Sequence, residues 1–233
     1  MRIGLLEAGR VPAELRAGHG DLPEMFRALL AGSGPGHHFR DYAAFEGELP
    51  ASTAECDAYL VTGSPDGVYD RLPWMAALQD FCRAAAGDGR KLVGVCFGHQ
   101  LLADAFGGTV EKAPEGWGVG IHRYLVQRSP PWMVPARPSF ATVAFHQDQI
   151  TQPPPGAAVL ASSEFCRFAM LQIDDNILAL QGHPEMSEAF AEDLLEILRQ
   201  RVGEEETDRA IASLRDGGDA ALVAGWIRRF LES

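Results

Sequence analysis

The stretch at residues 91–100 constrains the fold of this chain more than any other. Its apolar first half predicts a short buried strand, and a helix is predicted to begin directly after Cys96. Gly94 and Gly98 stand two residues before and two residues after the cysteine. This spacing is typical of a nucleophile elbow, in which the strand and the helix pass too close for a side chain at either glycine position.

Cys96 has two physical interpretations. A cysteine at the end of a buried strand is often a small apolar packing residue. In an elbow, the first N–H groups of the following helix point at the sulfur, and their partial positive charge favours the thiolate over the thiol. The flanking glycines and the switch from strand to helix favour the second interpretation, a nucleophilic cysteine.

Composition and charge exclude several functional classes. The 233 residues suffice for one large α/β domain or two small ones, and the net charge of −12 disfavours nucleic-acid backbones and anionic membranes as partners. No apolar run is long enough for a signal peptide or a membrane span, so we expect a cytoplasmic protein with reduced thiols. The four cysteines form no C-x-x-C pair, and His37 and His38 lack a further ligand in pattern. We predict no metal and no other cofactor.

Short apolar runs alternate with amphipathic segments in the first half of the chain. Strands are predicted at 3–6, 38–45, 57–62 and 92–95, with helices after Asp21, at 72–86 and at 97–106, and a turn at 32–36. This alternation indicates an α/β fold. The loop 63–74 follows a strand, at the edge where open α/β sheets bind ligands.

The second half changes character after residue 109. Short alternating segments predict antiparallel or mixed strands at 119–126, 141–145, 158–162, 168–173 and 177–180. A long amphipathic helix should follow to about residue 202. The tail 203–233 carries two helical patterns, 207–215 and 219–231, that share an apolar face. We expect this extension to pack on a domain formed by residues 1–202; the alternative is packing on another subunit.

A base for the cysteine is predicted at Gly182-His-Pro-Glu185. Pro184 biases His183 toward an extended conformation, in which residues two apart point the same way. The Glu185 carboxylate can then accept from one imidazole nitrogen and leave the other free to face the sulfur. Taken alone, the segment could be an ordinary helix start with proline in the first turn. Together with Cys96, it favours a catalytic histidine and its orienting acid.

Acyl transfer also needs donors for a developing oxyanion. The backbone N–H of Phe97, directly after the nucleophile, is one candidate. The turn Gly63-Ser64-Pro65 is built of small residues and can bring a second main-chain N–H close to the same point.

Three motifs together resemble the class I (triad-type) glutamine amidotransferases, in particular the glutaminase domain of GMP synthetase and its stand-alone relatives, which include γ-glutamyl peptidases. They are Gly-Val-Cys-Phe-Gly-His-Gln at 94–100, Gly-Ser-Pro at 63–65 and Gly-His-Pro-Glu at 182–185, in the family's order and spacing. The resemblance covers about residues 1–200. It implies a doubly wound, flavodoxin-like domain, with a mixed, mostly parallel sheet and helices on both faces.

The resemblance also implies roles for particular residues. It implies a Cys96-His183-Glu185 triad and an oxyanion hole formed by the N–H groups of Ser64 and Phe97. Gly63, Gln100 and His146 match positions that hold the substrate; His146 lies in Phe145-His-Gln-Asp148, the counterpart of the loop that lines the substrate's α-amino acid end. Ser64 departs from a glycine that is common in the family, but only its N–H is needed.

The expected reaction is hydrolysis of the γ-amide of glutamine through a cysteine thioester. The alternative within the same chemistry is a stand-alone hydrolase of γ-glutamyl peptides or γ-glutamyl amines, with segments 65–74 and 109–126 as candidates to line the leaving-group pocket. The chain shows no synthetase domain that could bind ATP or an amination acceptor, so a separate synthetase subunit would have to capture ammonia. An alternative of another class is a non-catalytic metabolite-binding regulator on the same scaffold.

Overall fold

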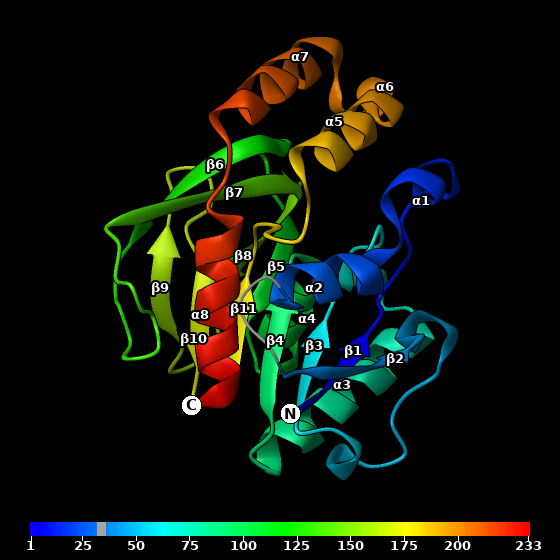
Figure 1. The fold of residues 1–233 in the computed structure, drawn as a ribbon, viewed down its shortest axis with the longest axis vertical. Coiled ribbons are helices and arrows are strands. Elements are labelled where there is room, and N and C mark those ends of the chain that lie inside the picture. Colours follow the sequence, from blue (N-terminus) through cyan, green and yellow to red (C-terminus); the bar gives the residue numbers. More distant parts are fainter. Residues whose placement is uncertain (32–35) are drawn as a thin grey trace.

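The computed structural model describes residues 1–31 and 36–233, so most of the predicted turn at 32–36 lies outside the described residues. These residues form a nine-stranded sheet and a separate pair of strands (Figure 1). In spatial order, the strands of the large sheet are β2 (His38–Tyr42), β1 (Arg2–Leu6), β3 (Ala58–Val61), β4 (Lys91–Val95), β11 (Ile177–Leu180), β10 (Met170–Ile173), β9 (Ala158–Ser162), β6 (Gly118–Val126) and β7 (Ser139–His146).

One half of the sheet is parallel. Strands β2, β1, β3, β4 and β11 run in the same direction, and β11 joins this half although it lies far along the chain from β4. All of the residues of β3 and β11 are buried, as expected of strands that are covered on both faces. The predicted mixed, mostly parallel sheet is therefore confirmed.

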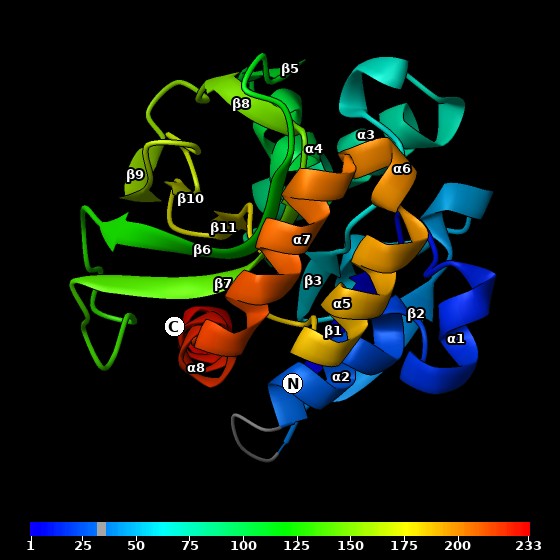
Figure 2. The ribbon, with the colours of Figure 1, turned by 90° about the horizontal axis from the view of Figure 1, so that it is seen from above.

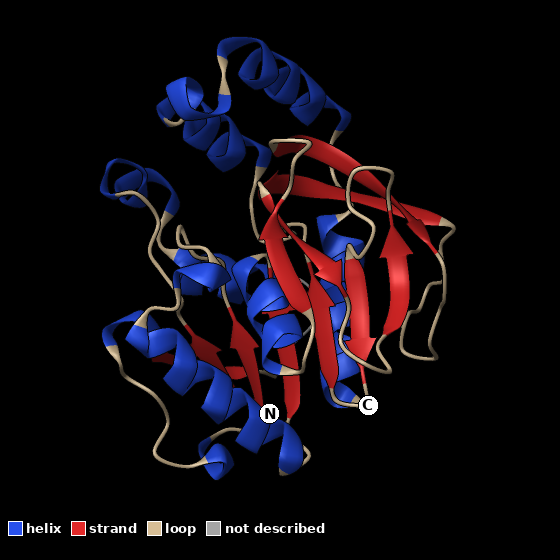
Figure 3. Ribbon diagram, turned by 180° about the vertical axis from the view of Figure 1, so that it is seen from behind, coloured by secondary structure: helices blue, strands red, loops and turns tan. Residues whose placement is uncertain are grey.

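The other half is antiparallel, as the alternating segments predicted. Strands β10, β9, β6 and β7 follow β11 with alternating direction, and the long β6–β7 pair forms the far edge (Figure 3). The additional pair of strands, β5 (Thr109–Lys112) and β8 (Asp148–Gln152), was not predicted. Both are short, and they carry charged and amide side chains that obscure a strand pattern.

Helices cover both faces of the sheet. The helices are α1 (Ala13–His19), α2 (Leu22–Ala31), α3 (Pro73–Gly87), α4 (Phe97–Ala105), α5 (Glu188–Ile197), α6 (Arg199–Val202), α7 (Glu204–Ser213) and α8 (Ala220–Glu232), with short 3₁₀ turns η1 (Ala44–Glu46), η2 (Thr53–Glu55), η3 (Val68–Asp70) and η4 (Leu214–Asp216). Helices α3 and α4 contribute to one apolar core, while α2 and α8 contribute to the other. The two cores make the doubly wound arrangement.

Four helices lie beyond the carboxyl edge of the parallel strands. Helices α1, α5, α6 and α7 stand over this edge, and Figure 2 looks down on them. No helix was predicted at α1, and one continuous helix was predicted in place of α5 and α6. The latter is interrupted at Leu198, which caps both segments.

The C-terminal helix α8 packs against the sheet. Trp226 is fully buried, and its indole N–H donates to the carbonyl oxygen of Pro135 at 3.1 Å. The start of the helix is held by Asp219, whose carboxylate and N–H bond the backbone of Ala141 in β7 at 2.8 and 2.7 Å. The tail thus shares a core with the strands that carry the rest of the fold.

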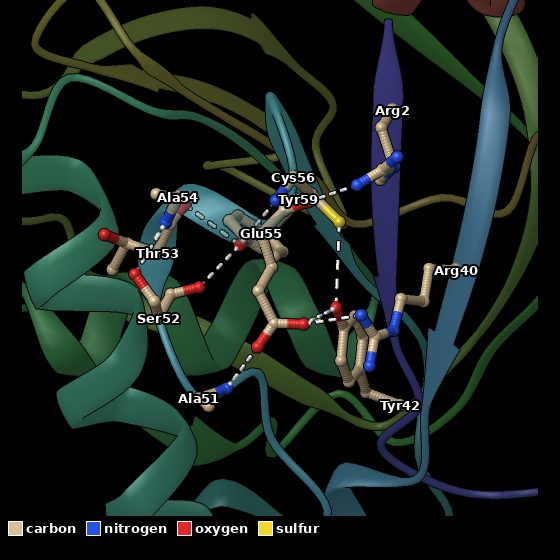
Figure 4. A network of polar contacts seen from close by, with 10 residues as sticks. All are labelled: Arg2, Arg40, Tyr42, Ala51, Ser52, Thr53, Ala54, Glu55, Cys56 and Tyr59. Atoms are coloured by element: carbon tan, nitrogen blue, oxygen red, sulfur yellow. Dashed lines mark hydrogen bonds and ion pairs between the residues drawn. The ribbon is translucent and has the colours of Figure 1, made fainter.

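A network around Glu55 holds the connection from β2 to β3 (Figure 4). The carboxylate of Glu55 accepts from the Tyr42 hydroxyl at 3.0 Å and the Ala51 N–H at 2.6 Å, and it pairs with Arg40 at 2.6 Å. Cys56 is buried beside it, 3.8 Å from the Tyr42 hydroxyl. This network lies at the amino end of β3, so Cys56 has a packing role in the connection.

Removing the indole of Trp226 tests how far the fold depends on α8. We expect Trp226→Ala to lower the free energy of unfolding by about 3–5 kcal/mol, because it opens a cavity in a core shared with the sheet. Urea denaturation followed by circular dichroism measures this loss, with Leu125→Ala, at a 57% exposed position, as the control. A separate early transition of the tail, with the main transition unchanged, would show that α8 is only an appendage.

Candidate active site

Cys96 lies at the turn between β4 and α4, as the elbow motif predicts. Its backbone has φ 53° and ψ −104°, a strained conformation for a residue with a side chain. The strain is held in place because the Cys96 N–H donates to the carbonyl oxygen of Leu180 in β11 at 2.8 Å. The side chain is 8% exposed. The sulfur is therefore presented at the carboxyl edge of the sheet in one fixed position.

Backbone contacts explain both glycines of the elbow. A Cβ on Gly94 would lie 2.4 Å from the carbonyl oxygen of Gly98, and a Cβ on Gly98 would lie 2.3 Å from that of Val61 in β3. Neither oxygen can move away, because each belongs to the backbone of a packed element. The first turn of α4 thus passes directly over two strands, and only glycine permits this approach.

His183 and Glu185 follow β11 and lie side by side. The extended backbone predicted for His183 is present, since its N–H donates to the carbonyl oxygen of Val143 in β7 at 2.7 Å. Nδ1 of His183 is 2.7 Å from Oε1 of Glu185, and both side chains are buried. A carboxylate only accepts, so Nδ1 carries the proton and Nε2 is the nitrogen left for another partner.

The charges around His183 favour its protonated form. Burial by itself lowers the pKa of His183, but the negative charges of Cys96 and Glu185 outweigh burial and raise it well above 6.5. Nε2 has no hydrogen-bond partner of normal geometry within the described part of the chain. The arrangement fits an imidazolium that Glu185 holds through Nδ1.

The loop after β3 brings Gly63 and Ser64 to the same place. A Cβ on Gly63 would lie 3.4 Å from the Cε1 atom of His183, so the loop passes directly beside the imidazole. Thr62 holds this loop: its hydroxyl accepts from the Ala8 N–H and donates to the Gly63 carbonyl oxygen, each at 3.0 Å. The sequence alone does not single out Thr62, because a threonine at the end of a strand is common.

The N–H groups predicted to face an oxyanion are available. Phe97 is the first residue of α4, a position whose N–H has no partner inside the helix. Within the described residues, no acceptor bonds the N–H of either Phe97 or Ser64. Both residues line the same cleft as Cys96 and His183.

The remaining predicted residues, Gln100 and His146, also line this cleft. Both are buried and both contact the carbonyl oxygen of Asp148, at 2.9 Å from Nε2 of Gln100 and 3.1 Å from Nδ1 of His146. The Asp148 carboxylate accepts from the Tyr69 hydroxyl at 2.8 Å, which ties the 63–70 loop to β8. Burial lowers the pKa of His146 to about 3, so its imidazole is neutral at physiological pH.

Gln181 contacts the sulfur and was not predicted from the sequence. The amide nitrogen of Gln100 donates to the Asp148 carbonyl oxygen and also to Gln181 at 3.0 Å, so the Gln181 atom that receives it must be the oxygen. The amide nitrogen of Gln181 then faces Cys96, at 3.6 Å from Sγ. The only sequence signal was a polar residue between an apolar strand and the Gly182-His183 motif.

His99 lies on the far side of Gln181. Its ring nitrogens face the Gln181 side-chain oxygen at 3.2 Å and the Phe168 carbonyl oxygen at 2.8 Å. Burial lowers the pKa of His99 to about 4, so the ring is neutral and donates to one of the two oxygens at a time. His99 therefore supports Gln181 from within the core and does not reach the cleft.

The cleft has a volume of about 530 Å³. The two predicted pocket segments both contribute, with Pro65, Asp66, Gly67, Tyr69 and Asp70 from the first and Lys112 and Trp117 from the second. A third wall, from α5 and the segment before α1, was not predicted. Among the described residues no cluster of side chains could hold a metal ion, and no helix is long and apolar enough to cross a membrane.

Comparisons with known proteins agree with this geometry. The family model described as glutamine amidotransferase class I matches residues 40–196. The chain is 27% identical to γ-glutamyl peptidase 3 of Arabidopsis thaliana over 74% of each chain, and 32% identical to a glutamine-hydrolysing GMP synthase chain of Sulfolobus acidocaldarius over 57% of this chain and 69% of the relative. A crystal structure of a glutamine amidotransferase from Methylobacillus flagellatus superposes with a TM-score of 0.74 at 25% identity, covering 99% of this chain and 91% of that one.

A substitution of Gln181 tests its contact with the sulfur. We expect Gln181→Leu to slow alkylation of Cys96 by iodoacetamide about tenfold at neutral pH, because the charged sulfur loses an N–H donor. Mass spectrometry of the modified peptide gives the rate, with Gln152→Leu, at an exposed position, as the control. A folded Gln181→Leu protein that alkylates as fast as the wild type would exclude this role for the amide.

The buried His146 makes stability depend on pH. Its pKa is depressed from 6.5 to about 3 on folding, so the unfolded chain binds more protons below pH 6.5. Its contribution to stability is present above pH 6.5 and falls by about 1.4 kcal/mol for each pH unit as the pH drops toward 3. We expect His146→Phe to remove this slope from urea titrations between pH 5.5 and 4.5. Equal slopes in the two proteins would show that His146 is not held neutral.

Proposed function

This chain belongs to the class I glutamine amidotransferase family, and on that premise we propose that it hydrolyses γ-glutamyl amides through a thioester on Cys96. The observation that carries the proposal is the meeting of three elements at one point. A cysteine on a strained elbow and a histidine whose pKa is raised by the charge of that cysteine line one cleft, and a buried carboxylate lies 2.7 Å from the histidine behind them. Glutamine is the simplest substrate of this class.

The first step forms the thioester. The Cys96 thiolate attacks the γ-carbonyl carbon of the substrate, and a carbon–sulfur bond forms as the carbonyl π electrons move onto oxygen. The tetrahedral intermediate then collapses and its carbon–nitrogen bond breaks. His183 donates the proton on Nε2 to the departing nitrogen, so that ammonia or a neutral amine leaves.

The second step consumes water. His183, now neutral, accepts a proton from water through Nε2, and the water oxygen attacks the thioester carbon. The carbon–sulfur bond breaks, which releases glutamate and restores the thiolate beside the imidazolium. Glu185 keeps Nδ1 protonated throughout, so that Nε2 is the nitrogen that exchanges protons in both steps.

Backbone N–H groups are proposed to stabilise the oxyanion. The N–H groups of Phe97 and Ser64 have no other acceptor in the described part of the chain and line the cleft with the sulfur. Donors of this kind contribute most when they are fixed before the charge develops. Thr62 fixes the Ser64 loop, and the elbow fixes Phe97. Gln100 and His146 are proposed to hold the α-amino acid end of the substrate.

A second candidate function, hydrolysis of γ-glutamyl peptides or γ-glutamyl amines, has its own support. The cleft does not end at the polar residues near Cys96 but continues along apolar side chains of α5, where a leaving group larger than ammonia could lie. The name γ-glutamyl peptidase among the relatives is consistent with this candidate. If ammonia is the product instead, we propose that a separate synthetase subunit captures it, as the GMP synthase name of another relative suggests.

The decisive experiment measures released products by mass spectrometry. The purified protein is given glutamine and, separately, γ-glutamyl dipeptides and γ-glutamyl amines, with Cys96→Ala as the control. We expect release of glutamate from at least one compound and a loss of about 10⁴-fold or more in Cys96→Ala, because no other side chain replaces the nucleophile.

The outcomes separate the candidates. Rapid cleavage of a peptide or amine identifies a stand-alone hydrolase, and slow turnover of glutamine alone identifies a subunit that waits for a partner. Binding without any turnover that depends on Cys96 would overturn the proposal and leave a non-catalytic metabolite-binding regulator on this scaffold.

A further inference from the structure

The cleft around Cys96 has one wall that the proposed chemistry does not use. This apolar wall consists of Val11, Leu22, Met186, Phe190, Leu194 and Leu198. Its members pack against one another in a single apolar cluster, so they form a preorganised surface. They belong to the same cavity as Cys96 and His183, which means that a molecule bound at the sulfur can extend onto them.

The wall suits only one half of a γ-glutamyl substrate. With the γ-carbonyl carbon at the sulfur, the glutamyl chain leads away to an α-ammonium and an α-carboxylate. Placing those charges against buried apolar side chains would carry a large desolvation cost. The polar residues Gln100 and His146, which line the same cleft, offer them a better environment. The apolar wall is then left for the group on the amide nitrogen, which is the leaving group.

A cation stands next to this wall. Arg201 in α6 follows Leu198 by three residues, its N–H bonds the Leu198 carbonyl oxygen at 2.8 Å, and both side chains line the cleft. The guanidinium lies 5.3 Å from the ring centroid of Trp117. Among the described residues no carboxylate pairs with it, whereas Arg10, which also lines the cleft, is paired with Glu46 at 3.1 Å.

Among the described residues, none of the three acids that line the cleft, Asp66, Asp70 and Asp148, forms an ion pair with Arg201, although the charge of Arg201 acts to lower the pKa of Asp148 against the larger effect of burial. The Asp148 carboxylate accepts from the Tyr69 hydroxyl, and the Asp70 carboxylate accepts from the Gly67 N–H, each at 2.8 Å. Burial and the charge of Asp70 raise the pKa of Asp66, which disfavours the charged carboxylate that an ion pair with Arg201 would need. Arg201 is thus available to a carboxylate from outside the chain.

We propose that the apolar wall binds the side chain of an amino acid leaving group while Arg201 binds its carboxylate. The substrates are then γ-glutamyl dipeptides whose second residue is bulky and apolar, and the reaction is dipeptide plus water to glutamate plus the free amino acid. This inference rests on the proposed function and names the leaving group of that same site. Glutamine, whose leaving group is ammonia, makes no use of the wall.

The test compares kcat/KM across compounds that share the γ-glutamyl half. The panel is γ-glutamylphenylalanine, γ-glutamylleucine, γ-glutamylglycine, γ-glutamylbenzylamine and glutamine. We expect the phenylalanine and leucine dipeptides to exceed γ-glutamylglycine and glutamine by at least about tenfold. If no compound is cleaved in a Cys96-dependent manner, the proposed function itself fails. Cleavage of all five at similar kcat/KM would overturn only the present inference.

Two variants locate the effect in the structure. Leu198→Gln should lower kcat/KM for γ-glutamylphenylalanine about tenfold and leave glutamine unchanged. Its matched control is Ile197→Gln, the preceding residue, which is 44% exposed and does not line the cleft. Equal effects of Leu198→Gln and Ile197→Gln on γ-glutamylphenylalanine would exclude the wall as the leaving-group site.

Arg201→Gln tests the carboxylate contact. We expect a rise of about three- to fivefold in KM for γ-glutamylphenylalanine, a modest effect because the arginine is exposed. γ-Glutamylbenzylamine has the ring but no carboxylate, so its KM should not change. The control is Arg209→Gln, an exposed arginine of α7 outside the cleft lining. An equal rise in KM for both substrates would show that Arg201 does not bind the carboxylate of the leaving group.

Discussion

The site depends on the close approach of α4 to the strands beneath it. The backbone oxygens of Gly98 and Val61 lie too close to allow a Cβ atom on Gly94 or Gly98, respectively. The helix can therefore begin this near to the strands only because both residues are glycine. That approach holds Cys96 in its strained conformation and leaves the Phe97 N–H at the start of the helix without an acceptor among the described residues. The proposed nucleophile and one proposed oxyanion donor thus depend on a single packing contact.

The insertion of β11 beside β4 supplies the partners of the sulfur. Strand β11 fixes the Cys96 N–H through Leu180, and the residues that follow it bring both Gln181 and His183 to the sulfur. The antiparallel half of the sheet also holds this segment, because the carbonyl oxygen of Val143 in β7 accepts from the His183 N–H. Both halves of the mixed sheet therefore set the position of the imidazole.

The parts of the site that sequence predicts are those governed by local backbone rules. Glycine spacing around Cys96 and the proline after His183 restrict dihedral angles within a few residues, and the structure shows the elbow and the extended segment they predict. Gln181 and His99 act across the sheet and leave no local pattern. The break between α5 and α6 at Leu198 could not be predicted from the sequence either, because the apolar periodicity continues through it. The division of the chain at residue 202 stays a prediction.

The apolar wall of the cleft draws on two separate parts of the chain. Phe190 and Leu194 belong to α5, which begins only three residues after Glu185, so a shift of that helix is transmitted directly to the acid and its histidine. Val11 lies in the segment after β1 and Leu22 begins α2, so neither residue is close to His183 or Glu185 along the chain. Changes at Val11 and Leu22 can therefore reshape the wall without altering the chain segment that carries His183 and Glu185.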